Sequence, residues 1–157
     1  MNATETTTTK LLAYHNDPAV KASYQERVRQ HQAADQVVQG YGYWKDGQGC
    51  AVGCTIHSGE LASYETELGI PRAIARLEDG IFENLPVQNA RRWPAEFLEA
   101  IPVGADLSGV KDQFLHWLLV DPTDGVIRFA QKEQTHRAIQ AVADLYDRKI
   151  AGGNIEL

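Results

Sequence analysis

Apolar residues recur at helical spacing along most of the chain. Ile74, Leu77, Ile81 and Leu85 lie three and four residues apart, so they share one face of a helix that Pro71 can open. Five other segments show similar apolar spacing or helix-end signals: 18–39, 60–68, 95–101, 107–120 and 129–150. This pattern predicts a mainly α protein, a compact single-domain bundle of five to six helices.

Residues with special backbone preferences mark where these helices begin and end. Asp17 can cap a helix that Pro18 opens, and Gly69 can take the left-handed conformation that ends one. The first nine residues contain five threonines and show no apolar period. We therefore expect a flexible N-terminal tail over 1–15 and a single helical domain over 16–151.

The segment 40–59, GYGYWKDGQGCAVGCTIHSG, differs from the rest of the chain. It holds both cysteines, six of the thirteen glycines and three of the thirteen aromatic residues. One interpretation is a short β-hairpin at 41–56, with Asp46 and Gly47 in the turn. Residues four apart in a strand are separated by roughly 13 Å, so both cysteines would then only pack.

The other interpretation of this segment is a helix that begins near Gly49. Cys50, Cys54 and His57 would then lie along one helical stripe. We favour the helix because the rest of the chain is helical, although Gly53 and the β-branched residues around it favour a strand. The sequence leaves the choice between helix and strand open.

The helical interpretation allows two kinds of chemistry. Cys50 in a first turn could be a nucleophile with a lowered pKa, and His57 could be its base, as in a small acyl-transfer or redox enzyme. Alternatively, Cys50, Cys54 and His57 could be three ligands of an open metal site, completed by His15 or His31. Because the second ligand pair of a structural zinc site is missing, we expect no cofactor or metal. Close packing of small residues remains the simpler explanation of the cysteines.

The aromatic residues of the same segment indicate a binding surface. Tyr41, Tyr43 and Trp44 are separated by glycine or adjacent to each other on a loop, and such side chains bury much area with few rotamers to order. With Cys54, they are the residues that we expect to contact a ligand or a partner.

Composition excludes several classes of function. A net charge of −6 repels phosphate backbones, so we do not expect nucleic acid as a partner. No apolar run approaches the ~20 residues that span a bilayer, and no secretory signal is visible, so we expect a soluble, cytoplasmic protein without a membrane partner. Motifs typical of dinucleotide-binding folds, P-loops, zinc proteases and α/β-hydrolases are absent from the sequence.

The sequence therefore predicts a small cytoplasmic binding or interaction domain that uses residues 41–57, with an unidentified protein or small molecule as its partner. The alternatives are a cysteine-dependent enzyme with Cys50 and His57, or a Cys/His metal-binding protein. Whether the chain is an enzyme stays open. The apolar stripes of its long helices are compatible with a homodimer.

Overall fold

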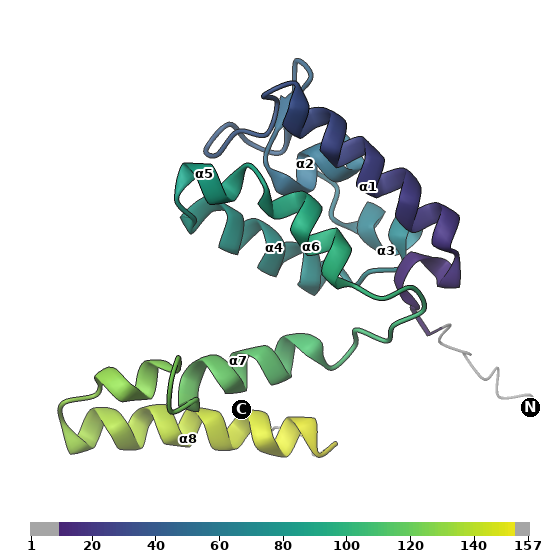
Figure 1. Cartoon of the computed structure of the whole chain (residues 1–157). Coiled ribbons are helices and arrows are strands. Elements are labelled where there is room, and N and C mark those ends of the chain that lie inside the picture. The colour runs from purple at the N-terminus through teal and green to yellow at the C-terminus, as the bar shows by residue number, and fades with distance from the viewer. Residues whose placement is uncertain (1–9, 153–157) are drawn as a thin grey trace, which may run out of the picture. The chain divides into compact units, whose positions relative to one another are not determined.

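The computed structural model describes residues 10–152, and it confirms a mainly α fold. Across these residues the chain forms eight α-helices and one two-stranded hairpin (Figure 1). None of the helices in the described range combines the length and the apolar character that crossing a membrane requires. The chain divides into two compact units, residues 1–107 and 108–157, which are described separately. The single domain over 16–151 stays a prediction.

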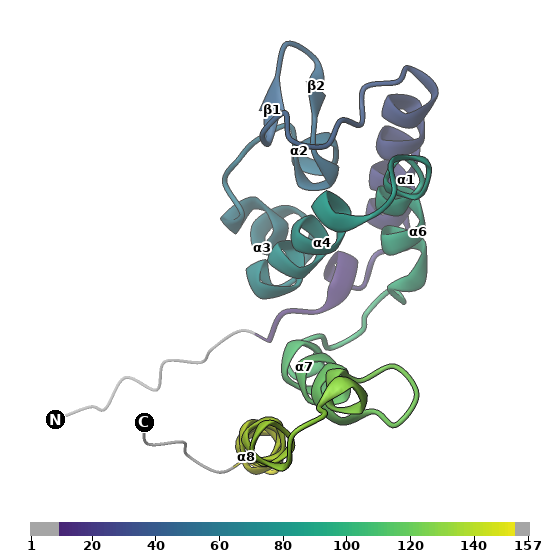
Figure 2. The same cartoon turned by 90° about the vertical axis from the view of Figure 1, so that its left-hand side faces the viewer.

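Helix α2 lies at the centre of the first unit. All six of its residues are buried, and it packs against α1, α4 and α6. Figure 2 shows the β1–β2 hairpin at the end of the unit where α2 lies. The elements of this unit, in chain order, are η1 Ala13–Asn16, α1 Pro18–Ala33, β1 Trp44–Lys45, β2 Gln48–Gly49, α2 Ala51–Ile56, α3 Ala62–Leu68, α4 Arg72–Asn84, α5 Val87–Ala90 and α6 Trp93–Ala100.

The core of this unit includes residues that we placed in a flexible tail. Residues 1–9 of that tail lie outside the described residues, but Ala13 and Tyr14 are fully buried. The Tyr14 hydroxyl donates a hydrogen bond of 2.7 Å to the Leu98 carbonyl, which ties the start of the described chain to α6. An aromatic ring with a satisfied hydroxyl can thus enter the core from a segment that has no apolar period.

Two of the predicted helix ends are observed and one is not. The Asp17 carboxylate accepts from the Ala19 amide at 2.8 Å, and Gly69 ends α3 with φ of 63°. Helix α1, however, ends at Ala33, six residues before the expected end. The chain instead turns back at Asp35, and the Val38 amide donates to the Gly49 carbonyl beside the hairpin. This pairing replaces the hydrogen bonds that a longer helix would have made.

The second unit is a helical hairpin. Its elements are α7 Val110–Val120, the 3-10 helix η2 Val126–Phe129 and α8 Glu133–Ile150. The segment after α7 forms a turn of the kind that its residues favour. The Asp121 carboxylate accepts from the amides of Thr123 and Asp124 at 2.8 Å each, which is a common way for Asp to hold a turn. Figure 1 shows α7 and α8 side by side.

Candidate functional site

The segment that stood out in the sequence combines both interpretations of it. Trp44–Lys45 pairs with Gln48–Gly49, and the turn residues Asp46 and Gly47 both have positive φ, at 51° and 78°. Helix α2 follows directly, from Ala51 to Ile56. The helical interpretation of the cysteine segment is therefore confirmed, and the hairpin is confined to four paired residues.

Two glycines allow the backbone before the hairpin to cross α2 in close contact. A Cβ atom on Gly49 or on Gly53 would overlap the carbonyl oxygen of Tyr43. This crossing explains the glycine inside α2, which otherwise costs helix stability. The crossing also fixes the backbone at Tyr43 and Trp44, and it thereby sets the position from which their aromatic side chains extend.

Both cysteines are free and buried. Burial is the main cause that raises the pKa of the Cys50 thiol far above its usual range, and the neighbouring Asp79 carboxyl group adds to it. Burial likewise raises the pKa of Cys54 to about 12. The Cys54 thiol donates to the carbonyls of Gln36 and Gly49. Both groups are therefore thiols at neutral pH, which is the opposite of what a cysteine nucleophile requires.

His57 ends α2 and lies against two other rings. Its φ of 53° is uncommon for a residue with a side chain, and it directs the chain away from the helix. The His57 ring stacks on Trp44 with centroids 4.3 Å apart, and its Nε2 atom is 2.7 Å from Nε2 of His31. Burial, followed by the charges of Arg27 and His31, lowers its pKa. His57 is thus paired with a second histidine.

The hydrogen bonds around His31 determine which ring nitrogens carry protons. Nδ1 of His31 lies 2.6 Å from Oε1 of Gln36, which can only accept, so Nδ1 carries the proton. In neutral His31 the Nε2 atom then accepts from the Nε2–H group of His57. Trp44 contacts His31 edge-on at 5.1 Å between centroids. These three rings form a packed aromatic cluster in which both nitrogens of His31 and Nε2 of His57 have partners.

Tyr41 and Tyr43 are exposed, at 40% and 38%, whereas Trp44 is half-buried by the histidines. The predicted binding residues thus divide into two groups. Tyr41 and Tyr43 are accessible to a partner, whereas Trp44 and Cys54 pack within the unit. That these four residues contact a ligand or a partner stays a prediction.

A small pocket lies beside Cys50, between the segment before the hairpin and α4. It has a volume of about 160 Å³ and is lined by Gly42, Tyr43, Cys50, Asp79 and Glu83. The Glu83 carboxylate accepts from the Gly40 amide at 2.8 Å, which holds the loop to α4. Asp79, Glu83 and Tyr43 therefore line a space that is large enough for a small polar group.

One atom next to this pocket has an unmet hydrogen-bonding requirement. The Oδ1 atom of Asp79 is buried and has no partner among the described residues. A buried acceptor without a donor costs roughly 1–3 kcal/mol. A donor supplied from outside the chain would recover that free energy.

The neighbouring residue on α4, Glu78, is fully buried. Its carboxyl group accepts from the Tyr64 hydroxyl at 2.5 Å, and its Oε1 atom has no partner among the described residues. Burial is the main cause that raises the pKa of Glu78 to about 8, although the Tyr64 hydrogen bond opposes this effect. Glu78 is therefore mostly protonated at neutral pH, inside the core next to the pocket.

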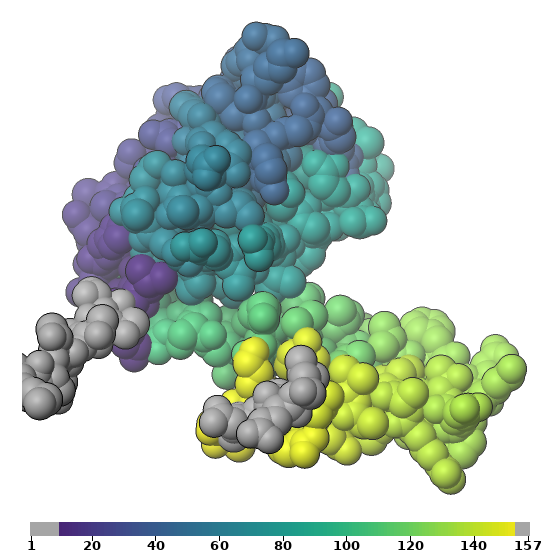
Figure 3. Space-filling view, turned by 180° about the vertical axis from the view of Figure 1, so that it is seen from behind, coloured from purple at the N-terminus to yellow at the C-terminus, as the bar shows by residue number. Residues whose placement is uncertain are grey.

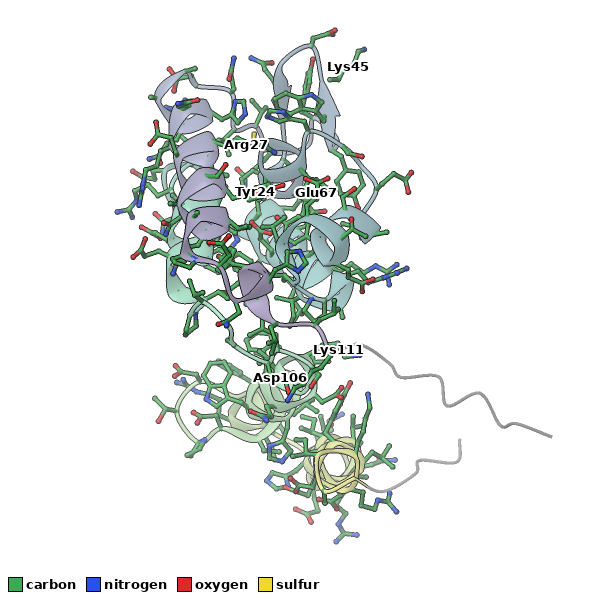
Figure 4. All side chains as sticks on the ribbon, turned by 90° about the vertical axis from the view of Figure 1, so that its right-hand side faces the viewer. Tyr24, Arg27, Lys45, Glu67, Asp106 and Lys111 are labelled. Atoms are coloured by element: carbon green, nitrogen blue, oxygen red, sulfur yellow. The ribbon has the colours of Figure 1, made fainter. Side chains whose placement is uncertain are left out.

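A chain of contacts joins α1 to α3 on another face of the unit. The Tyr24 hydroxyl donates to Glu67 at 2.6 Å, and the Arg27 guanidinium lies 4.6 Å from the centre of the Tyr24 ring (Figure 4). Arg27 also donates to the Thr55 carbonyl at 2.8 Å, near the end of α2. These bonds hold the end of α2, and hence His57, in place.

A larger hollow of about 490 Å³ lies between α1 and α6, but it is a weaker candidate. Arg29 and Glu99, two of its lining residues, form an ion pair at 3.4 Å, so their charges offset each other. The remaining lining residues are Ala95, Glu96 and Ala100. No lining atom of this hollow is a buried polar group without a partner.

Sequence reasoning did not find Asp79, Glu83 or Glu78. These residues lie on the predicted helix 71–85, and acidic residues on a helix normally face solvent. One signal was present: Glu78 is one residue after Leu77 and four after Ile74, so it borders the apolar stripe. Only the packing of α2 against α4 shows that this border is buried.

No metal centre is formed by the predicted ligands. Within residues 10–152 there is no group of three or more Cys, His, Asp and Glu side chains arranged to hold a metal ion. His15, one of the proposed fourth ligands, lies 3.1 Å from the Thr66 carbonyl through Nε2.

Comparison with known proteins identifies no relative. No family model matches the chain, and neither a curated protein nor a solved structure is significantly similar to it.

Proposed function

We propose that this chain is a binding protein whose 41–57 segment recognises a positively charged group. The ligand is an ammonium or guanidinium group, presented by a partner protein or by a small molecule. The observation that carries the proposal is the buried Oδ1 atom of Asp79, which has no donor beside a pocket that contains two carboxylates. The proposed setting is the cytoplasm, in keeping with two free cysteines.

The chemistry of the pocket favours a cation over other ligands. Asp79 and Glu83 supply acceptors, and charge-assisted hydrogen bonds to carboxylates are roughly twice as strong as neutral ones. Tyr43 adds an aromatic ring at the rim, where a cation gains about 0.5–1 kcal/mol over a ring face. An anion would meet two like charges, so the pocket selects against it.

The size of the pocket indicates that only the end of a ligand enters it. Its volume of about 160 Å³ is below the ~300 Å³ or more of pockets that enclose a whole drug-sized molecule. The rest of the ligand would lie on the surface beside it, where Tyr41 and Tyr43 are exposed. A basic side chain on a partner protein fits this division between a small pocket and an aromatic rim.

One basic residue of the chain acts on the same region. The charge of Arg76 lowers the pKa of the Tyr43 phenol, against the larger effects of burial and of Asp79 that raise it. Arg76 is exposed, so it does not occupy a buried position in the pocket. Its positive charge should weaken the binding of a cationic ligand. A variant that removes this charge should therefore strengthen binding, whereas a variant that removes a pocket carboxylate should weaken it.

The test is an NMR titration of the full chain with Nα-acetyl-L-argininamide, with Nα-acetyl-L-citrullinamide as the neutral ligand of nearly the same shape. We expect argininamide to shift amide signals of residues 42–50 and 79–83, and citrullinamide to shift them far less. Asp79→Asn should weaken binding by about tenfold or more, since a charged hydrogen bond contributes about 1.5–3 kcal/mol. Arg76→Gln should strengthen it.

The matched control is Glu60→Gln, which removes one exposed carboxylate that does not line the pocket. It lowers the net negative charge by the same amount as Asp79→Asn, so it reports the general attraction of an acidic protein for cations. Equal losses in the two variants, or equal shifts from both amides, would refute a specific cation pocket.

A further inference from the structure

The second unit leaves much of its apolar surface exposed or only half-buried. In its described part, residues 108–152, only Gly125 and Ala143 are buried, and no residue of α7 is. Six of the nine large hydrophobic residues that are exposed in the described chain belong to this unit: Val110, Trp117, Val126, Phe129, Val142 and Ile150. Phe129 is the most exposed of these, at 71%.

Two helices alone cannot bury such a surface. On α8 the residues Ile139, Val142, Ala143, Tyr146 and Ile150 follow a spacing of three and four, which is the stripe of a core-facing helix. Each helix of the pair covers one side of its neighbour only, so a helical hairpin leaves the other side open. Helical bundles close this gap with further helices.

Several charged side chains of this unit are paired within it. Lys149 bonds to Asp112 at 2.9 Å, Arg137 bonds to Glu133 at 2.8 Å, and His116 lies 3.1 Å from Asp147. These interactions lie within the unit and remain available when the apolar face is covered. Residues 108–157 contain six Lys and Arg against seven Asp and Glu, a net charge of −1, so two such units barely repel each other.

The first unit is a poorer match for this face. It carries the other five net negative charges of the chain, and its exposed large hydrophobic residues are Tyr41, Tyr43 and Val87 among the described positions. A face rich in exposed apolar residues is matched best by a surface of the same kind, and in the described chain that surface is the second unit itself. A two-fold axis brings identical faces together.

We propose that the chain is a homodimer in which the α7–α8 hairpins of two copies pack into a four-helix bundle. Figure 3 shows α7 in green and α8 in yellow-green to yellow as adjacent rods of atoms. In the dimer, Val142 and Ile150 of each copy lie against the apolar residues of the other copy. The first unit and its pocket are not needed for this association, so the inference stands independently of the proposed function.

The experiment compares three full-length chains by light scattering after size exclusion, with circular dichroism on the same samples. We expect wild type at about twice the chain mass of 17.4 kDa. Val142→Glu with Ile150→Glu places two charges in the apolar face and should be monomeric. Gln134→Glu with Ala141→Glu places the same two charges on exposed positions of the opposite face of α8, and should remain dimeric.

The outcomes are distinct. A monomeric Val142→Glu/Ile150→Glu chain beside a dimeric control supports the proposal, whether or not its helix content falls with dissociation. A monomeric wild type up to sub-millimolar concentration overturns it. A double variant that stays dimeric places any dimer interface elsewhere and also overturns it, as does a control that dissociates to the same extent.

Discussion

Glu78 is the residue whose surroundings differ most from those its side chain favours. It is fully buried, it accepts one hydrogen bond, from Tyr64, and its Oε1 atom has no partner among the described residues. A lone carboxylate in this position would be costly, so the group keeps its proton. Glu78 therefore links the stability of the core, next to the proposed pocket, to pH.

The first prediction concerns this proton. The pKa of Glu78 is raised from 4.5 to about 8 in the folded chain, so between these values the folded state binds more protons than the unfolded state. The stability from the protonated group is therefore fully present below pH 4.5 and is lost as the pH rises through about 8. In the wild type this loss of unfolding free energy is on the order of a few kcal/mol. We expect Glu78→Gln, which stays neutral and can still accept from Tyr64, to remove most of it.

Urea denaturation of both chains at several pH values between 5 and 9 measures the effect. Because histidines also titrate in this range, the informative quantity is the difference between variant and wild type, with Glu60→Gln as an exposed control. Parallel pH profiles for wild type and Glu78→Gln would show that Glu78 is ionised in the folded core.

Among the elements, α2 depends most on close backbone contact. Gly53 lies in its interior, where a Cβ atom would overlap the Tyr43 carbonyl oxygen, whereas Gly80 lies inside α4 with no described atom within 4 Å of such a Cβ. The same substitution therefore has opposite expected effects at the two glycines. Gly80→Ala removes a poor helix former without a clash, and Gly53→Ala forces two backbones apart.

The expected changes in the free energy of unfolding are a gain of about 0.5–1 kcal/mol for Gly80→Ala and a loss of about 1–3 kcal/mol or more for Gly53→Ala. Chemical denaturation measures both. If Gly53→Ala proved as stable as Gly80→Ala, the segment before the hairpin would not cross α2 at this distance.

For the whole molecule, we expect the stability of the second unit to depend on protein concentration. If its helices are completed by a second copy, association stabilises them, and their unfolding temperature rises with concentration. Amide hydrogen exchange of α7 and α8 at low and high concentration measures this, with α4 in the first unit as the internal control. We expect slower exchange at high concentration in α7 and α8 alone; identical rates at both concentrations would count against a dimer held by these helices.

The local signals in the sequence were sufficient for most of the helices. Period, caps and glycines located α3, α4, α6 and α7 to within a few residues, because these features act between residues that are close along the chain. Helix α1 was predicted too long because its end depends on pairing between Val38 and Gly49, eleven residues apart. The four-residue helix α5 is too short to show a period.

For the candidate site, the sequence by itself determined the segment: glycines, aromatics and cysteines concentrate at 40–59, and their composition can be seen without a fold. The tertiary structure decided how the side chains of that segment are placed. It buried both thiols, paired His57 with His31 and placed Asp79 at a pocket beside Cys50. These outcomes depend on contacts between residues that are far apart along the chain, and they are set by burial, which no local pattern of residue types records.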